Sequence, residues 1–477
     1  MCLEVPAGKT DIIFSVYALI FFTTEIILIA NHISKQERQF FMDHSEARNA
    51  VRAAIEKRRD FLCAVGTHIW NNPEPGFREE KTSAYLVDIF RSLGLEVKTG
   101  LAVTGFRADI DTGRPGPTVA ILGELDSLVL PNHPECDKTT GAVHACGHNA
   151  SATGLLGAAI GIVESGVIDS LCGKIAFIGT PAEEGIEMDY RKSLIDAGKI
   201  KSISGKSQLL REGVFDDVDI SYMHHLSTRY GYNDHNGCVN KKITIRGKSC
   251  HAASPQKGHN ALNGATLALN AIAMLREVYS NDKYVRIHGI ISNGGSAVNI
   301  IPDTVTLEYM LRAPDLDSIV ALNDRFDKVV MYAARAAECE AAIETVHGFM
   351  PLIDDPELGE LMKETTLYVN PEANYDHNQN FLSSCTDMGD IATVIPAVHG
   401  YVPGGSGTAH GIDYRISDPE KAYIENSIIN AIIAVDLLYG DAAKGKAIAA
   451  GKKDLLPIPE YIRIIDSLSK TVKSEEL

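Results

Sequence analysis

Three short apolar segments constrain the fold of this chain most, because each is followed by polar residues able to bind an ion or a substrate. They are Thr118–Gly123, Lys174–Gly179 and Val218–Met223. The small and apolar residues after His148 predict a buried helix between the first two segments. Nearly continuous apolar strands that alternate with helices are typical of a parallel sheet covered on both faces. The chain is therefore predicted to form an α/β domain with a mixed, largely parallel sheet.

A second pattern begins near Cys238 and predicts an inserted α+β domain over 238–348. Its expected elements, in order, are the strand Lys241–Arg246, the helix Ala261–Val278, the strands Tyr284–Ile291 and Thr304–Leu311, the helix Ile319–Ala337 and the strand Ala341–Val346. The order β-α-β-β-α-β is that of the ferredoxin-like arrangement. The α/β domain is then expected over 45–237 and 349–450, between an extension at 1–44 and a charged, loosely attached tail at 451–477.

Charge and cysteine usage limit the partners and the compartment. The net charge of the 477 residues is −17, which disfavours binding to nucleic acid or to anionic membranes. The nine cysteines are scattered and odd in number, which disfavours a disulfide framework and favours a cytoplasmic location. The apolar segment Ile12–Ala30 has about the length of a membrane span, but Glu25 interrupts it. A membrane anchor is not excluded there, although a packed extension is the preferred interpretation.

Two of the strand ends carry groups that suit a metal ion. Cys146 and His148 stand two residues apart, and a thiolate with an imidazole suits zinc and similar ions. Glu183 and Glu184 follow the second apolar segment, where adjacent carboxylates repel unless a cation lies beside them. Each pair also has a plain structural interpretation, as a buried small residue with a core histidine, or as a solvated acidic turn.

Histidines complete the set of candidate ligands, with two choices left open. His224 and His225 end the third apolar segment, and either could face the ends of the strands. The loop after residue 404 presents His410, and His399 competes with it. Cysteine, histidine and glutamate at successive strand ends form the pattern of a two-metal hydrolase centre.

Seven motifs give the chain a family resemblance from Ala47 to Tyr439. They are Ile69–Glu74 with Phe77, Gly123–Leu128, His144–Asn149, Thr180–Gly185, His251–Pro255, Asn299–Asp303 and Ser384–Asp390. With these motifs the chain resembles the aminoacylase, carboxypeptidase-G and amidohydrolase superfamily, metallopeptidase family twenty. Within it, the chain is most similar to the branch of p-aminobenzoyl-glutamate hydrolases and of dipeptidases that act on β-alanyl-lysine or Xaa-Arg.

The resemblance implies a role for each matching residue. The family's five ligands of two divalent ions, zinc or manganese, match Cys146, His148, Glu184, His225 and His410. Glu183 matches the general base that activates a metal-bridging water. His251 and Asn299 lie in the inserted domain, through which the family forms homodimers, and such a histidine steadies the oxyanion in the partner's site. Arg312 matches a position that binds the substrate's carboxylate.

The expected activity is hydrolysis of the amide bond in a small dipeptide or an N-acyl or aminobenzoyl amino acid. Three alternatives stay open: an N-acyl amino acid deacylase of the same fold, a non-catalytic dimeric binding protein, and a metal-free hydrolase that uses Cys146 and His148. No role is predicted for the insertion Lys192–Arg211.

Overall fold

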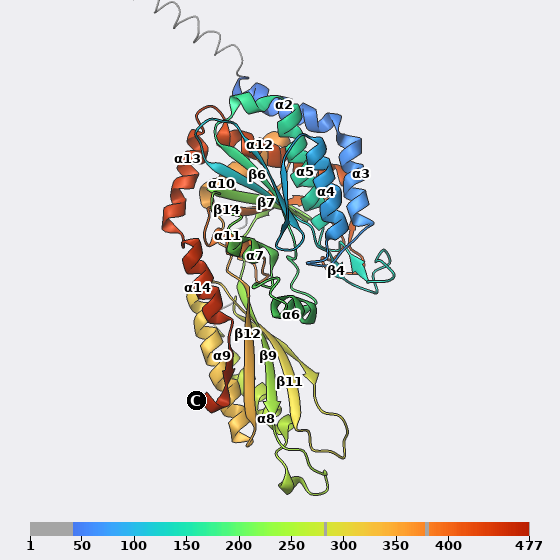
Figure 1. Ribbon diagram of the computed structural model, residues 1–477, viewed down its shortest axis with the longest axis vertical. Coiled ribbons are helices and arrows are strands. Elements are labelled where there is room, and N and C mark those ends of the chain that lie inside the picture. The colour runs from blue at the N-terminus through green and yellow to red at the C-terminus, as the bar shows by residue number, and fades with distance from the viewer. Residues whose placement is uncertain (1–41, 281–283, 377–380, 477) are drawn as a thin grey trace, which may run out of the picture.

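The computed structural model describes residues 42–476 except 281–283 and 377–380, and Figure 1 shows an upper α/β domain with a second domain hanging below it. The upper domain is built on an eight-stranded sheet in the order β1-β2-β6-β3-β7-β14-β8-β13. These strands are β1 (Val97–Leu101), β2 (Gly105–Asp111), β3 (Thr118–Glu124), β6 (Lys174–Thr180), β7 (Ile220–Ser227), β8 (Tyr230–Tyr232), β13 (Tyr375–Asp376) and β14 (Ala397–Pro403). The central neighbours β6, β3, β7 and β14 run parallel. The predicted mixed, largely parallel sheet is therefore confirmed.

One face of this sheet is covered by helices whose small residues allow close packing. These helices are α2 (His44–Lys57), α3 (Arg59–Trp70), α4 (Glu80–Ser92), α5 (His148–Glu164), α10 (Pro356–Val369) and α12 (Asn426–Leu438). The helix α5 is buried from His148 to Ile162. Its residue Gly157 leaves no space for a Cβ atom against Ser427 of α12, so the glycine sets how closely the two helices approach.

The opposite face carries a second apolar core that supports the polar strand ends. Leu122 and Ile178 of the sheet pack there with Leu209 of α7 (Gly205–Arg211) and Ile391 of α11 (Met388–Ala392). The helix α6 (Met188–Asp196) lies between this face and the lower domain (Figure 1). The insertion Lys192–Arg211, for which no role was predicted, thus forms the end of α6 and all of α7.

The lower domain, here called the lid, contains the predicted β-α-β-β-α-β unit. Its elements are β9 (Gly237–Arg246), α8 (Ala261–Val278), β10 (Arg286–Asn293), β11 (Thr304–Ala313), α9 (Leu316–Ala336) and β12 (Glu340–Phe349). The strand order is β10-β11-β9-β12-β17, and the two helices cover one face of the sheet. The fifth strand, β17 (Thr471–Lys473), was not predicted and pairs with β12.

The expectation of a loosely attached tail is wrong. The helix α14 (Ile458–Leu468) buries Tyr461, Ile465 and Leu468, which recur at helical spacing on one side. Tyr461 and Ile465 pack into the core of the upper domain, whereas Leu468 packs into that of the lid. The high charge of the tail belongs to the exposed side of this helix.

Apolar residues recur at helical spacing from Ser45 to Phe61, but this segment belongs to two helices, because α2 ends at Lys57 and α3 begins at Arg59. The expected end of the third apolar strand before His224 also needs correction. The histidines His224 and His225 lie inside β7, since its pairing with β14 continues to Ser227. The apolar segment Ile12–Ala30 lies outside the described residues, and among the residues that are described no helix has both the length and the hydropathy of a membrane span.

Candidate metal centre

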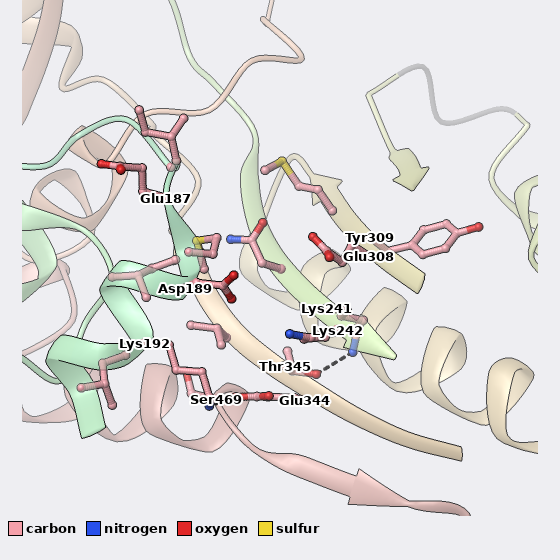
Figure 2. A pocket seen from close by; sticks show the side chains of 18 of the residues that line it. Glu187, Asp189, Lys192, Lys241, Lys242, Glu308, Tyr309, Glu344, Thr345 and Ser469 are labelled. Carbon is pink, nitrogen blue, oxygen red and sulfur yellow. Dashed lines mark hydrogen bonds and ion pairs between the residues drawn. The ribbon is translucent and has the colours of Figure 1, made fainter. Parts of the chain in front are cut away.

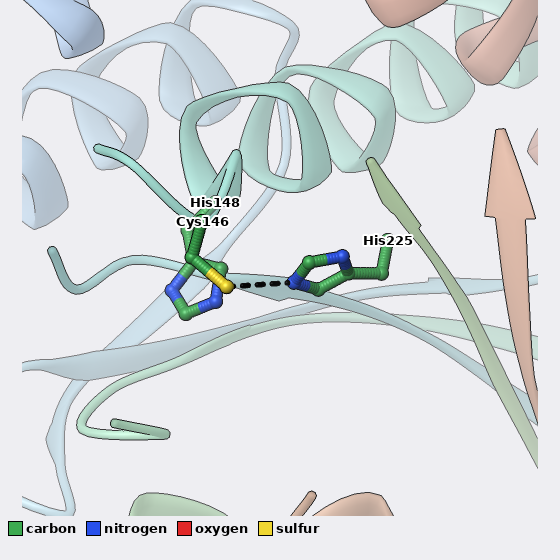
Figure 3. Close-up of side chains that lie close together, drawn as sticks. All are labelled: Cys146, His148 and His225. Atoms are coloured by element: carbon green, nitrogen blue, oxygen red, sulfur yellow. Dashed lines mark hydrogen bonds between the residues drawn. The ribbon is translucent and has the colours of Figure 1, made fainter. Parts of the chain in front are cut away.

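The predicted ligands converge at the carboxyl ends of β3, β6 and β7, beside the first turn of α5. Gly147 caps α5 with a φ of 88°, a left-handed conformation that glycine adopts without strain. This turn places Cys146 and His148 on the same side of the chain (Figure 3).

The first group of donor atoms consists of Cys146, His148 and His225. Cys146 Sγ lies 3.3 Å from His225 Nε2 (Figure 3), and the rings of His148 and His225 meet edge to face. The donor atoms of all three side chains lie within 4.8 Å of one another. Such spacing is close enough for one ion to contact all three.

The second group consists of Cys146, Glu184 and His410, and it shares its thiol with the first group. His410 Nε2 lies 3.3 Å from Cys146 Sγ and 3.5 Å from Glu184 Oε1. The backbone of His410 is left-handed, with a φ of 62°, and its N–H donates to the carbonyl of Ala145. Because the two groups share Cys146, they would form two adjacent metal sites.

The geometry separates the histidines that the sequence left ambiguous. His224 turns to the helical face of the sheet, where its Nδ1 lies 2.7 Å from Asn430 Oδ1. His399 is buried next to His225, with ring centroids 5.6 Å apart, but it belongs to none of the donor groups found in the described residues. His225 and His410 are therefore the histidines that the structure brings to Cys146.

Asp126 holds both halves of the centre in place. Its Oδ1 lies 3.1 Å from His148 Nδ1, and its Oδ2 accepts the backbone N–H of Glu184 at 2.9 Å. Burial alone would raise the pKa of Asp126, yet the hydrogen bond and charge of His148, the N–H of Glu184 and the charge of Arg191 together outweigh it and lower the pKa to about 2. Asp126 is thus an ionised carboxylate that orients one candidate ligand and the backbone of another.

A buried charge cluster that sequence reasoning missed lies beneath Glu183. Carboxylate oxygens of Glu124, Glu183 and Asp387 lie within 4.8 Å of one another. Lys206 Nζ lies 2.6 Å from Glu124 Oε1 and 2.5 Å from Asp387 Oδ1, and all three of these side chains are fully buried. In the sequence, the acids Glu124 and Asp126 at the end of an apolar strand indicated buried charge here. Lys206, the cation that pairs with Glu124 and Asp387, comes from the insertion and had no such signal.

The pKa of Glu183 is raised well above that of an ordinary glutamate. Burial is the largest cause, followed by repulsion from Glu184 and Glu124. A carboxyl group in such surroundings binds a proton readily unless cations lie beside it.

The donor set fits divalent metal ions. Among the buried atoms of the described residues that have no hydrogen-bond partner are Glu124 Oε2, His148 Nε2 and Glu184 Oε1, which all belong to this centre. Sulfur, imidazole and carboxylate donors together suit zinc and also admit manganese. The buried acids near the centre outnumber its buried cations, Lys206 and Arg191. Bound metal ions would therefore compensate the excess negative charge.

The remaining predicted residues lie away from this centre. His251 and Asn299 are exposed on loops at the end of the lid farthest from the upper domain. Arg312 lies where β11 approaches the upper domain, and its guanidinium donates to the carbonyl of Ser383 at 3.1 Å. The structure therefore brings the five candidate ligands and Glu183 together, but not these three residues.

A cavity of about 1270 Å³ separates α6 from the open face of the lid sheet. Figure 2 shows Asp189 and Lys192 of α6 on one side, and Lys242, Glu308 and Glu344 of the lid strands on the other. Gly185, which directly follows Glu184, lines the same cavity. The space thus begins next to the candidate centre.

Comparisons with known proteins agree with this architecture. Residues 233–338 match the family model of the peptidase dimerisation domain. The Xaa-Arg dipeptidase of Mus musculus is 30% identical over 366 residues, which cover 73% of this chain and 77% of that protein. A p-aminobenzoyl-glutamate hydrolase subunit of Escherichia coli (strain K12) is 31% identical over 297 residues, covering 60% of this chain and 57% of that protein.

A solved structure shares the fold. The YXEP protein of Bacillus subtilis, a dinuclear metal binding peptidase from the M20 family, superposes with a TM-score of 0.61 at 18% identity. The match covers 80% of this chain and 99% of that protein. With the identity to the mouse relative and the match of the lid to the dimerisation domain, the chain belongs to the M20 family of peptidases and amidohydrolases.

Proposed function

We propose that the chain is a metal-dependent hydrolase that cleaves the amide bond of a small dipeptide or of an N-acyl or aminobenzoyl amino acid. The observation that carries this proposal is the pair of donor groups that share Cys146, with Glu183 directly beside Glu184. Two ions of zinc or manganese, when bound, would supply Lewis acidity that activates water and polarises the amide carbonyl.

Glu183 would act as the general base. Its carboxylate would accept a proton from the attacking water and then pass that proton to the leaving amine. The acids around Glu183 raise its proton affinity, which favours this exchange over permanent ionisation. Glu184 would act as a ligand instead, which its 3.5 Å distance from His410 Nε2 supports.

His251 would serve the centre of a second subunit. The strand β9 has 10 residues and so spans roughly 30 Å, which puts the loop that carries His251 far from the centre of its own chain. A homodimer formed through the lid would bring this histidine to the partner's substrate, where its imidazole can stabilise the oxyanion. Exposed apolar side chains on one edge and one helix of the lid, Ile290, Ile291, Met274 and Val278, fit such a contact.

The cavity between α6 and the lid would receive the substrate. Arg312 would bind the substrate's carboxylate, since a guanidinium forms bidentate bonds with carboxylates. Asn299, which lies with His251 at the far end of the lid, would act in the partner's site. The names of the two relatives, a Xaa-Arg dipeptidase and an aminobenzoyl-glutamate hydrolase, point to substrates of this size. A deacylase acting on N-acyl amino acids would use the same residues.

A metal-free reaction with Cys146 as nucleophile is disfavoured by the environment of the thiol. Burial raises the pKa of Cys146 well above that of a free cysteine, and Glu184 raises it further. A reactive cysteine needs the opposite, an electropositive and partly open setting. The eight described cysteines are free thiols, which fits a reducing compartment such as the cytoplasm.

The proposal is tested by an activity screen with added Zn²⁺ or Mn²⁺. The substrates are p-aminobenzoyl-glutamate, β-alanyl and Xaa-Arg dipeptides, and N-acyl amino acids. The expected result is metal-dependent hydrolysis of at least one class, lowered by about 10³-fold or more in Glu183→Gln. Turnover in Glu183→Gln close to that of the unchanged protein would contradict the proposal, as would activity that survives chelation but not thiol alkylation.

A further inference from the structure

The helix α6, which leads into the insertion, buries a charged residue where a short helix normally buries apolar ones. Only Arg191 and Leu194 of its nine residues are buried, and Arg191 is 1% exposed. The helix starts directly after the loop that carries Glu183 and Glu184, where Glu187 has a left-handed φ of 51°. Arginine is rarely buried to this degree unless its surroundings bind the guanidinium.

The guanidinium of Arg191 binds the backbone of the glutamate loop from both sides. It donates to the carbonyl of Ala182, which precedes Glu183, and to the carbonyl of Glu184 itself. A third bond goes to the carbonyl of Ile203, near the end of the insertion. The ring of Phe77 lies under the guanidinium, and Gly76 has no side chain that would displace it, since a Cβ atom there would lie 2.7 Å from Arg191 Nη2.

This loop needs such support because it has no regular structure of its own. Residues 181–183 belong to no helix or strand, and Ala182 has a left-handed φ of 54°. A non-glycine residue in that conformation persists only where neighbouring contacts hold it. The backbone N–H of Gly205 also donates to the carbonyl of Ala182, and that of Ile186 to the carbonyl of Glu184. Arg191 thus completes a set of donors around the loop.

The charge of Arg191 suits the site as well as its shape does. Burial lowers the pKa of the guanidinium, while Asp126, Glu79 and Asp387 oppose that effect. The guanidinium presents a planar fork of five donors, whereas a lysine ammonium is a point charge on a flexible chain. An ammonium group therefore cannot replace the three carbonyl contacts at once.

We propose that Arg191 is a positioning residue that fixes the Glu183–Glu184 loop, so that the helix α6 sets the geometry of both the base and one ligand. This inference rests on the proposed function, since it concerns the same centre. A displacement of about 1 Å at a reacting group costs on the order of 100-fold in rate. Loss of the guanidinium should therefore lower kcat far more than it changes KM.

The test compares Arg191→Lys and Arg191→Met with two matched controls. Arg107→Lys alters another buried arginine, one that binds Asp109, Asp217 and the carbonyl of Val214 away from the centre. Lys199→Met removes an exposed charge from the insertion itself. The readouts are kcat and KM, the Kd for Zn²⁺ measured by equilibrium dialysis, and the unfolding midpoint.

The expected result is a loss of kcat of about 100-fold in Arg191→Lys with KM changed by less than about threefold. Binding of Zn²⁺ should weaken by about tenfold through Glu184, while both controls stay near the unchanged protein. A folded Arg191→Lys protein with unchanged kcat and unchanged Zn²⁺ affinity would overturn the proposal. If the unchanged protein hydrolyses none of the substrates, the proposed function fails, and the Zn²⁺ affinities of the variants still decide the role of Arg191.

Discussion

The ring nitrogen Nδ1 of His148 lies 2.9 Å from the carbonyl oxygen and 3.1 Å from Oδ1 of Asp126. Both oxygens can only accept hydrogen bonds, so Nδ1 carries the proton. When a metal ion displaces the second proton, the lone pair of the neutral ring is on Nε2. This atom has no hydrogen-bond partner among the described residues and lies 3.3 Å from Glu124 Oε2.

Substituting Asp126→Asn should weaken the binding of the first metal ion. The amide removes the negative charge and can direct an N–H group at His148 or at the backbone of Glu184, both of which already donate. A loss of about 10- to 100-fold in affinity is expected. Equilibrium dialysis with Zn²⁺ measures it, with Asp216→Asn, an exposed acid on the surface, as the control. Equal affinities for the two variants would argue against the orienting role of Asp126.

Metal binding should release protons and strengthen as the pH rises. Burial and Glu184 raise the pKa of Cys146, so the metal-free thiol is protonated at neutral pH. Burial lowers the pKa of His148, but Glu124 and Cys146 outweigh it and leave that ring protonated too. For each proton that the metal displaces, the metal affinity should rise by up to about tenfold per pH unit. Titration calorimetry in buffers of different ionisation enthalpy counts the protons, and a pH-independent affinity would contradict this expectation.

The pH dependence of stability should reveal the buried carboxyl group of Glu79. Its oxygens accept from Thr104 Oγ1 at 2.6 Å and from the N–H of Ala182 at 2.8 Å. Burial, and then Asp126, raise its pKa from 4.5 to about 8. The folded state therefore binds this proton more tightly than the unfolded state does. The contribution of Glu79 to the free energy of unfolding is full below pH 4.5 and is lost as the pH rises to about 8.

Glu79→Gln keeps a neutral side chain of the same shape and should remove this loss. The variant should gain stability relative to the unchanged protein between pH 5 and 8, at about 1.4 kcal/mol for each pKa unit at most. Urea unfolding of the metal-free proteins at both ends of that range measures the difference. A constant difference across the range would mean that Glu79 does not titrate there.

The C-terminal segment should contribute measurably to stability through Tyr461. Its hydroxyl lies 2.9 Å from Asp390 Oδ1 and 2.9 Å from Ser207 Oγ, and the whole residue is buried. Asp390 also binds His347 of β12, so one carboxylate connects the tail, the upper domain and the lid. Tyr461→Phe should lower the free energy of unfolding by about 1–3 kcal/mol. Tyr332→Phe, on an exposed ring, is the control, and equal stability of both variants would contradict the account.

Much of this architecture was open to prediction from local patterns. The apolar runs of β3, β6 and β7 predicted a parallel sheet, and the alternation in the lid predicted its topology. The edge strand β1 and its neighbour β2 were missed. The strand β1 exposes most of its residues and has no apolar run to mark it. In the tail, the spacing of Tyr461, Ile465 and Leu468 carried the signal of a packed helix, which its charged composition obscured.

The candidate centre was predictable where its residues stand near the end of an apolar strand or at the start of the buried helix, as Glu184, His225 and Cys146 do. The choice between His399 and His410 needed the structure, because it depends on how a loop folds back to Cys146. Lys206 and Arg191 could not be identified from sequence. Lys206 lies in the insertion and Arg191 directly before it, and their partners Asp387 and Ala182 contact them only through the fold.

The most direct measurement is the number of metal ions bound by the protein and by its Cys146→Ser variant, determined by native mass spectrometry after loading with Zn²⁺. Because Cys146 belongs to both donor groups, the unchanged protein should bind two ions per chain, and the variant should lose affinity for both. Fewer than two ions on the unchanged protein, or two ions held equally well by Cys146→Ser, would contradict a dinuclear centre built on this thiol.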